Sequence, residues 1–216
     1  MNRRIRTARA VGYLVGNVVL ALGLTLNTQT QLGVSPIMSI AYSTSELFGM
    51  NFGNTVFAMY VIFVAAEMVI HIYLKRYRTI PLDAAQILLS LLFTRVLNFF
   101  KLVIPDFVAD LGGTIWGSMP SRIMFLLLSI VLTGIGAAMT LNARLVPNPG
   151  DGIVQAIADL ADKDIGLTKN LVDATCVTIT CAVSMFFGGR IIGIGIGTLL
   201  AMLGVGRVIT AYNALF

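Results

Sequence analysis

The stretch LVPNPGDGI, residues 145–153, interrupts the second half of the chain between two long apolar runs. Its prolines and glycines are poor residues for a helix interior, so the stretch predicts a break in the middle of a membrane-embedded region. A related stretch, LGVSPIMSI, occupies residues 32–40, and its Pro36 lies 113 positions before Pro149. The two stretches together predict a duplicated unit that is broken at the same place in each copy.

The composition predicts an all-α polytopic membrane protein. Of the 216 residues, 57% are hydrophobic and 12% are charged, whereas soluble domains carry about 25% charged residues. A bilayer-crossing helix needs about 20 apolar residues, and the sequence holds six runs of about this length. They cover residues 9–28, 53–74, 82–103, 122–142, 169–187 and 191–212. We therefore expect a single membrane domain over residues 1–216.

Basic residues predict the orientation of these spans, because loops on the cytoplasmic side carry an excess of lysine and arginine. With the N-terminus inside, eleven basic residues lie on the cytoplasmic side. They are Arg3, Arg4, Arg6, Arg9, Lys75, Arg76, Arg78, Arg144, Lys163, Lys169 and Arg207. We expect a multi-pass protein of the bacterial cytoplasmic membrane with both termini in the cytoplasm, provided that residues 32–49 and 148–163 do not cross. This asymmetry explains the sequence pI of about 9.5 without a nucleic-acid partner.

Identities at a nearly constant offset extend the duplication beyond the two prolines. The pairs at an offset of 113 are Leu32 with Leu145, Pro36 with Pro149, Ile40 with Ile153 and Leu47 with Leu160. Repeat one then covers about 9–103 and repeat two about 122–212, each with three spans and one short broken or re-entrant helix. Three crossings is an odd number, so the second copy enters from the opposite face. Such inverted repeats are common in secondary transporters.

Each broken segment contains the signal for a helix start. Serine and asparagine are favoured N-caps, and proline suits the first helical position, so Ser35-Pro36 and Asn148-Pro149 predict two short helices at matched positions. If both enter the membrane, their N-termini approach each other and present free N–H groups to an anion. The alternative is a pair of interfacial helices without a ligand.

Three short motifs resemble the bacterial YczE/YitT-like family of integral membrane proteins. They are Gly33-Val34-Ser35-Pro36, Pro149-Gly150-Asp151-Gly152 and Gly195-Ile196-Gly197-Thr198. The resemblance implies a duplicated membrane core and leaves the biochemical activity undefined. Members often have an acidic residue soon after the first Ser-Pro. Here Met38 stands where Asp151 stands in the second copy, so a symmetric pair of carboxylates is not expected.

Polar side chains within the third span predict an interior face. Gln86, Ser90, Thr94 and Asn98 recur every four residues, and Arg95 lies beside them. An arginine fork binds carboxylate or phosphate at two points, but Arg95 is also able to snorkel outward or to act as a structural strut. The predicted substrate-binding residues are Ser35, Pro36, Arg95, Asn98, Asn148, Pro149 and Asp151.

Three further ionisable residues are candidates for ion coupling. Glu67 and His71 are four residues apart in the second span and share a helix face, and Asp173 lies in the fifth span. The alternatives are structural: Glu67 paired with Arg95, and Asp173 paired with Lys169. His71 is the single histidine, so we expect no multi-histidine metal site, and we expect neither a metal nor a cofactor.

Two hypotheses for the function follow. The first is a small secondary transporter or facilitator, in which the inverted repeats alternate access to a small anionic or zwitterionic solute. The second is a non-transporting accessory or regulatory protein of an envelope complex. The sequence contains no catalytic motif, so we do not expect an enzyme. The expected partners are the solute, the lipid bilayer and a second copy of the chain, which would dimerise through a GxxxG face such as Gly12 and Gly16.

Overall fold

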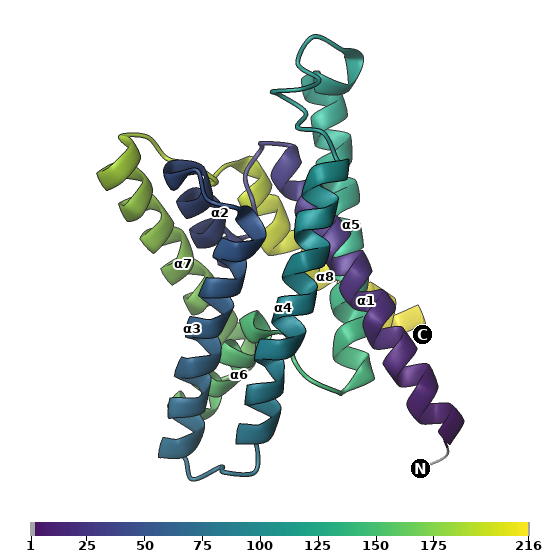
Figure 1. Cartoon of the computed structure of the whole chain (residues 1–216), viewed down its shortest axis with the longest axis vertical. Helices are drawn as coiled ribbons and strands as arrows, with labels where there is room; N and C mark the ends of the chain where they lie inside the picture. The colour runs from purple at the N-terminus through teal and green to yellow at the C-terminus, as the bar shows by residue number, and fades with distance from the viewer. Residues whose placement is uncertain (1–2, 216) are drawn as a thin grey trace.

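The computed structural model describes residues 3–215. The side chains of residues 3–6 and 8 lie outside that description, and so do the charges that we counted at Arg3, Arg4 and Arg6. The described elements are α1 (Arg3–Gln29), α2 (Pro36–Phe48), α3 (Phe52–Tyr73), α4 (Ile80–Val103), the 3-10 turn η1 (Ile115–Gly117), α5 (Met119–Ala143), α6 (Pro149–Ala161), α7 (Ile165–Gly188) and α8 (Ile196–Leu215). The described chain is thus all-helical (Figure 1).

Six of these helices are long and apolar enough to cross a membrane: α1 from Arg9 onward, α3, α4, α5, α7 and α8. The prediction of a multi-pass membrane protein is confirmed at this level. One boundary was wrong, because α8 begins at Ile196 and not at residue 191. Gly193 has a φ of 83°, which lies outside the right-handed helical region, so α8 does not extend back to residue 191.

The remaining two helices, α2 and α6, are matched in length and position. Each contains 13 residues, which corresponds to about 20 Å, whereas the hydrocarbon core of a bilayer is about 30 Å thick. Both begin at the proline that the sequence predicted. In Figure 1, α2 lies in the upper half of the bundle and α6 in the lower half, so the two short helices occupy opposite ends.

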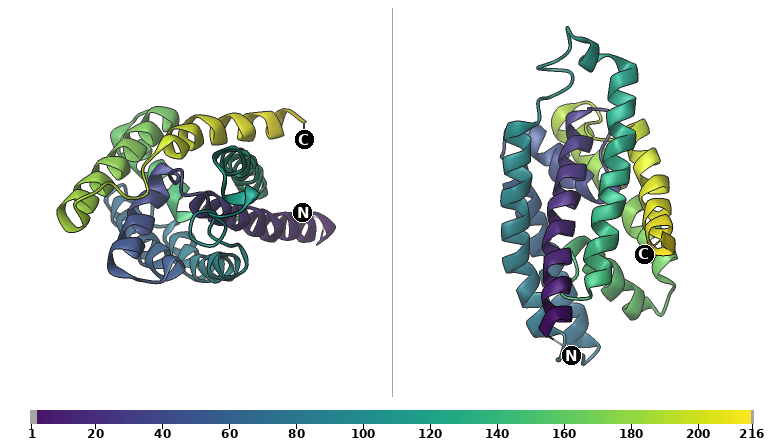
Figure 2. Two further views of the ribbon diagram at one scale, coloured as in Figure 1. Left: turned by 90° about the horizontal axis from the view of Figure 1, so that it is seen from above. Right: turned by 90° about the vertical axis from the view of Figure 1, so that its right-hand side faces the viewer.

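The helices pack in a pattern that pairs the two halves of the chain. The longest interface joins α1 and α5; α2 packs on α7 as α6 packs on α3, and α4 packs on α1 as α8 packs on α5. Glycines allow the backbones of α1 and α5 to approach closely, since a Cβ atom at Gly136 would lie 2.4 Å from the backbone nitrogen of Leu20. The two halves differ in one respect. In the first half, α3 also packs along α4, whereas in the second half α8 lies along the outside of α5 (Figure 2).

Backbone hydrogen bonds to the segment around the start of α8 hold the start of α2. The Val34 amide donates to the Gly193 carbonyl at 2.9 Å, and the Gly197 amide donates to the Leu32 carbonyl at 2.7 Å. Gly33 sits between these bonds with a φ of 109°, and a Cβ atom there would lie 2.6 Å from the nitrogen of Gly195. The motifs at residues 33–36 and 195–198, which lie far apart in the sequence, therefore pack against each other.

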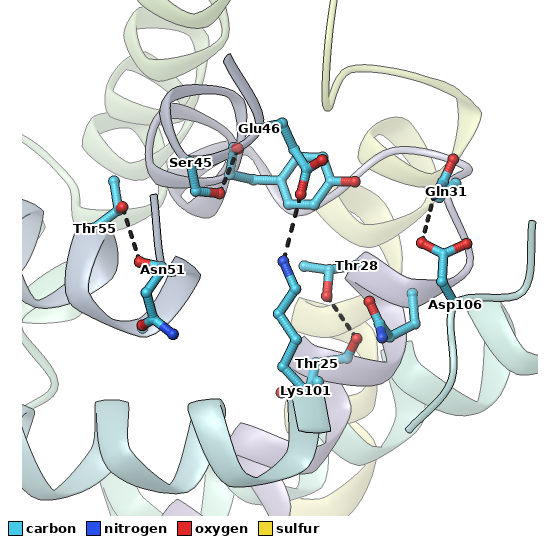
Figure 3. Close-up of polar contacts among 12 residues, drawn as sticks. Thr25, Thr28, Gln31, Ser45, Glu46, Asn51, Thr55, Lys101 and Asp106 are labelled. Carbon is cyan, nitrogen blue, oxygen red and sulfur yellow. Dashed lines mark hydrogen bonds and ion pairs between the residues drawn. The ribbon is translucent and has the colours of Figure 1, made fainter. Parts of the chain in front are cut away.

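Ion pairs fix the far ends of the two short helices. At the end shown in Figure 3, Lys101 of α4 lies 3.4 Å from Glu46 of α2. At the other end of the bundle, Arg76 in the α3–α4 turn pairs with Asp159 of α6. Glu46 and Asp159 are themselves 113 positions apart, so each short helix carries its acidic residue at the same position along the helix.

Candidate functional site

The N-termini of α2 and α6 meet inside the bundle. A Cβ atom at Gly150, in the first turn of α6, would lie 3.4 Å from Cδ1 of Ile37 in the first turn of α2. The caps differ: the Asn148 Oδ1 atom accepts a hydrogen bond from the Gly150 amide at 3.0 Å, whereas the half-buried Ser35 hydroxyl makes no capping bond. The first turn of α2 therefore keeps a free hydroxyl beside its N–H groups.

Polar side chains of α3, α6 and α7 surround this meeting point. The buried Tyr60 hydroxyl lies 3.8 Å from the Met38 sulfur and beside the side chain of Asn148. Asp151 lies close to Asp173, whose buried carboxylate is 3.6 Å from the half-exposed Lys169 ammonium group. The centre thus combines helix N-termini, which favour negative charge, with two carboxylates, which favour positive charge.

A second polar cluster lies between α3, α4 and α6. The His71 Nδ1 atom is 2.7 Å from Oδ2 of Asp83. The Gln86 amide donates to both oxygens of the Glu67 carboxylate, at 3.0 and 2.9 Å. All four residues are buried, with exposed fractions of 6% or less. Because burial of a charge is costly, each charged group of this buried cluster needs a hydrogen-bonding or oppositely charged partner.

The cluster touches α6 at a position that corresponds to a residue of α2. A Cβ atom at Gly152 would lie 2.5 Å from Oε2 of Glu67, and the hydroxyl of Ser39 lies 2.7 Å from that of Thr180. Residues 39 and 152 are 113 positions apart, and so are residues 67 and 180. Each short helix therefore contacts the long helix of the other half at matched positions.

The structure places the residues predicted from the sequence in three groups. Ser35, Pro36, Asn148, Pro149 and Asp151 come together at the meeting point, with Asp173 nearby. Glu67 and His71 join the second cluster. Asn98 lies elsewhere, because its Oδ1 atom accepts a hydrogen bond from the Gly53 amide at 2.9 Å and so ties α4 to the start of α3.

Arg95 lies outside both sites. Its side chain is exposed on α4, while the neighbouring Thr94 and the preceding Ser90 and Gln86 are buried. Successive helical residues point about 100° apart, so burial of this polar stripe turns Arg95 toward the exposed face that carries Leu92 and Phe99. The expectation that Arg95 lines the interior or neutralises Glu67 is corrected: a neutral amide supplies the hydrogen bonds to Glu67.

Sequence reasoning missed two residues of these sites. Asp83 is three residues before Gln86 and extends the polar stripe of α4 by one turn, so its helical spacing was the available signal. Tyr60 gave no such signal, because one tyrosine in an apolar span has many ordinary explanations. The residue 113 positions after Tyr60 is Asp173, but the two residue types differ.

Alanine at position 152 is expected to destabilise the protein by about 1 kcal/mol, because the added methyl group meets the Glu67 carboxylate and overpacking carries a cost of this order. The measurement is the unfolding midpoint of the purified protein in detergent. Gly206→Ala in α8 is the matched control, since a Cβ atom there meets nothing within 4 Å. Equal midpoints for both variants would contradict the close contact between α6 and Glu67.

Comparison with known proteins gives a family without an assigned activity. A family model described as "Family of unknown function (DUF6198)" matches residues 7–214. The "Uncharacterized protein YyaS" of Bacillus subtilis (strain 168) is 26% identical over 200 residues, which cover 88% of this chain and 85% of that protein. No solved structure matches the chain.

Proposed function

We propose that this protein, which belongs to the DUF6198 family of unknown function, is a small secondary transporter or facilitator of a zwitterionic or anionic solute. The observation that carries the proposal is the contact between the first turns of two half-length helices, at Ile37 and Gly150, inside a six-span bundle. Interrupted helices whose N-termini meet near the centre of the membrane form the substrate sites of many secondary transporters.

The proposed architecture is a pair of inverted repeats, α1–α4 and α5–α8, in which α2 and α6 re-enter the membrane from opposite faces. The support comes from the contacts Ser39–Thr180 and Gly152–Glu67, which an offset of 113 interchanges. Arg76 is one of the basic residues assigned to the cytoplasmic side, so its ion pair with Asp159 supports a cytoplasmic location for the C-terminal end of α6. The same orientation places both termini in the cytoplasm. The resemblance to YczE/YitT-like proteins is part of this proposal, because it implies the same duplicated membrane core.

The charges at the centre favour a zwitterion among the candidate solutes. The N–H groups at the start of α2, with the free Ser35 hydroxyl, suit a carboxylate or phosphate group. Asp151 and Asp173 suit an ammonium group on the same solute. A solute with an acidic and a basic group a few bonds apart would satisfy both sides, and rocking of the two halves would expose it to either face.

A ligand screen tests this proposal. We expect small zwitterions to raise the melting temperature of the purified protein in a saturable way, because a ligand that binds the folded state stabilises it by mass action. Asp173→Asn is expected to weaken that binding by about tenfold or more, as the loss of a hydrogen bond to a charged group predicts. The control is Asp162→Asn, which changes an exposed acid at the end of α6.

The same ligands would then be tested for uptake into liposomes that contain the protein. Uptake that Asp173→Asn reduces and Asp162→Asn leaves unchanged would support the transporter. Binding of cations alone would overturn the zwitterion assignment. A well-folded protein that binds no solute of the panel would favour the accessory protein of an envelope complex.

A further inference from the structure

Within the second polar cluster, the side chains of Glu67, His71 and Asp83 have the spacing of a metal site. One ligand atom from each of Glu67, His71 and Asp83 lies within 4.8 Å of the other two. Metal–ligand bonds to nitrogen and oxygen of about 2.0–2.2 Å place the ligand atoms about 3–4.3 Å apart around one ion. The observed spacing therefore needs only small side-chain rotations to reach that range.

The charge of the cluster also favours a cation. Glu67 and Asp83 are 3% and 2% exposed, and the hydrogen bonds to Glu67 come from the neutral amide of Gln86. The cluster holds two carboxyl groups and one imidazole, and the Gln86 amide adds no charge. A divalent cation between the two carboxylates would neutralise both while His71 stays neutral, which is the form that binds metals.

Two further buried oxygens of α4 lack a hydrogen-bond partner among the described residues, and the one on Gln86 belongs to a side chain that contacts Glu67. The Oε1 atom of Gln86 and the hydroxyl of Ser90 are buried and have no hydrogen-bond partner in the described part of the chain. Both belong to the stripe of α4 that begins with Asp83, and Gln86 is 1% exposed. A buried carbonyl oxygen without a partner is costly, and coordination of a cation would satisfy it.

We propose that Glu67, His71, Asp83 and Gln86 bind one divalent first-row metal ion of the Mn²⁺ or Zn²⁺ type. The imidazole nitrogen selects such ions over Mg²⁺ and Ca²⁺, which prefer an all-oxygen shell, and the carboxylates suit Mn²⁺ and Zn²⁺ alike. The ion would join α3 to α4 and, through the contact of Glu67 with Gly152, would hold α6. The site does not depend on the proposed transport activity.

Elemental analysis of the full-length protein, purified without chelator, tests the proposal. We expect about one equivalent of manganese or zinc per chain, since ligand sets of this type bind such ions tightly at neutral pH. Glu67→Gln and Asp83→Asn are each expected to lose the metal. The matched control is Asp173→Asn, which removes a buried carboxylate outside the cluster and is expected to keep the metal.

Metal exchange gives a second readout on the wild-type protein. Treatment with EDTA is expected to lower the melting temperature, and Mn²⁺ or Zn²⁺ but not Mg²⁺, Ca²⁺ or Na⁺ is expected to restore it. Metal-free protein that no ion stabilises would overturn the proposal, and so would stabilisation by Na⁺ alone. Retention of the metal in both Glu67→Gln and Asp83→Asn would overturn the proposal as well. If a variant fails to fold, the metal exchange on the wild-type protein still tests the proposal.

Discussion

Alanine at position 136 is expected to destabilise the protein by about 3 kcal/mol, although alanine is the better helix former. The new Cβ atom would lie 2.4 Å from the nitrogen and 2.7 Å from the Cα of Leu20, and 2.8 Å from the carbonyl oxygen of Gly16. These are backbone atoms of α1, so they move only if the whole helix moves. In a membrane, where association of helices depends on close packing, such a shift weakens the interface that joins the two halves.

The unfolding midpoint in detergent, followed over a denaturant series, measures this effect. Gly12→Ala is the matched control, because it changes a glycine of α1 where a Cβ atom meets nothing within 4 Å. That variant is expected to be as stable as the wild type or more stable by up to about 1 kcal/mol. If Gly136→Ala matched Gly12→Ala, then α1 and α5 would not be in close contact in the membrane.

The spans and the two short helices were predictable because their signals are local. A run of apolar residues defines a span wherever it packs, and the sequences Ser35-Pro36 and Asn148-Pro149 define helix starts without help from distant residues. The start of α8 was not predictable in this way. Residues 191–195 are apolar enough for a helix, but they are not helical. Their conformation depends on hydrogen bonds that join Gly193 to Val34 and Gly197 to Leu32, which no local pattern reveals.

The candidate sites were less predictable because they depend on helix rotation. Arg95 and Thr94 are adjacent in sequence, and the polar stripe alone did not show which of them would be buried. Packing of α4 against both α1 and α3 decided this in favour of Thr94. The same packing brought Asp83 to His71, two residues on different helices. Pairings of this kind require tertiary structure, although the polar periodicity limited the choices.

Replacement of His71 by leucine is expected to destabilise the metal-free protein by about 3–5 kcal/mol, the largest effect that we predict. The reason is electrostatic: the Asp83 carboxylate would stay buried without the imidazole that lies 2.7 Å away. The Arg76–Asp159 pair provides the control, because the Arg76 side chain is 49% exposed and exposed ion pairs contribute at most about 1 kcal/mol. Arg76→Leu should therefore have a small effect in the same unfolding measurement.

A double-mutant cycle separates the loss of the pair from the loss of packing. If the unpaired carboxylate causes the damage, the variant with leucine at both 71 and 83 should recover most of the stability that His71→Leu loses, because it leaves no buried carboxylate at position 83 without a partner. Additive losses from the two substitutions would contradict the direct pairing of His71 with Asp83. All variants are measured in EDTA, so that bound metal does not contribute to the comparison. Recovery of stability without recovery of metal binding would show that the ionic residues at this site are required for the ion and not for the fold.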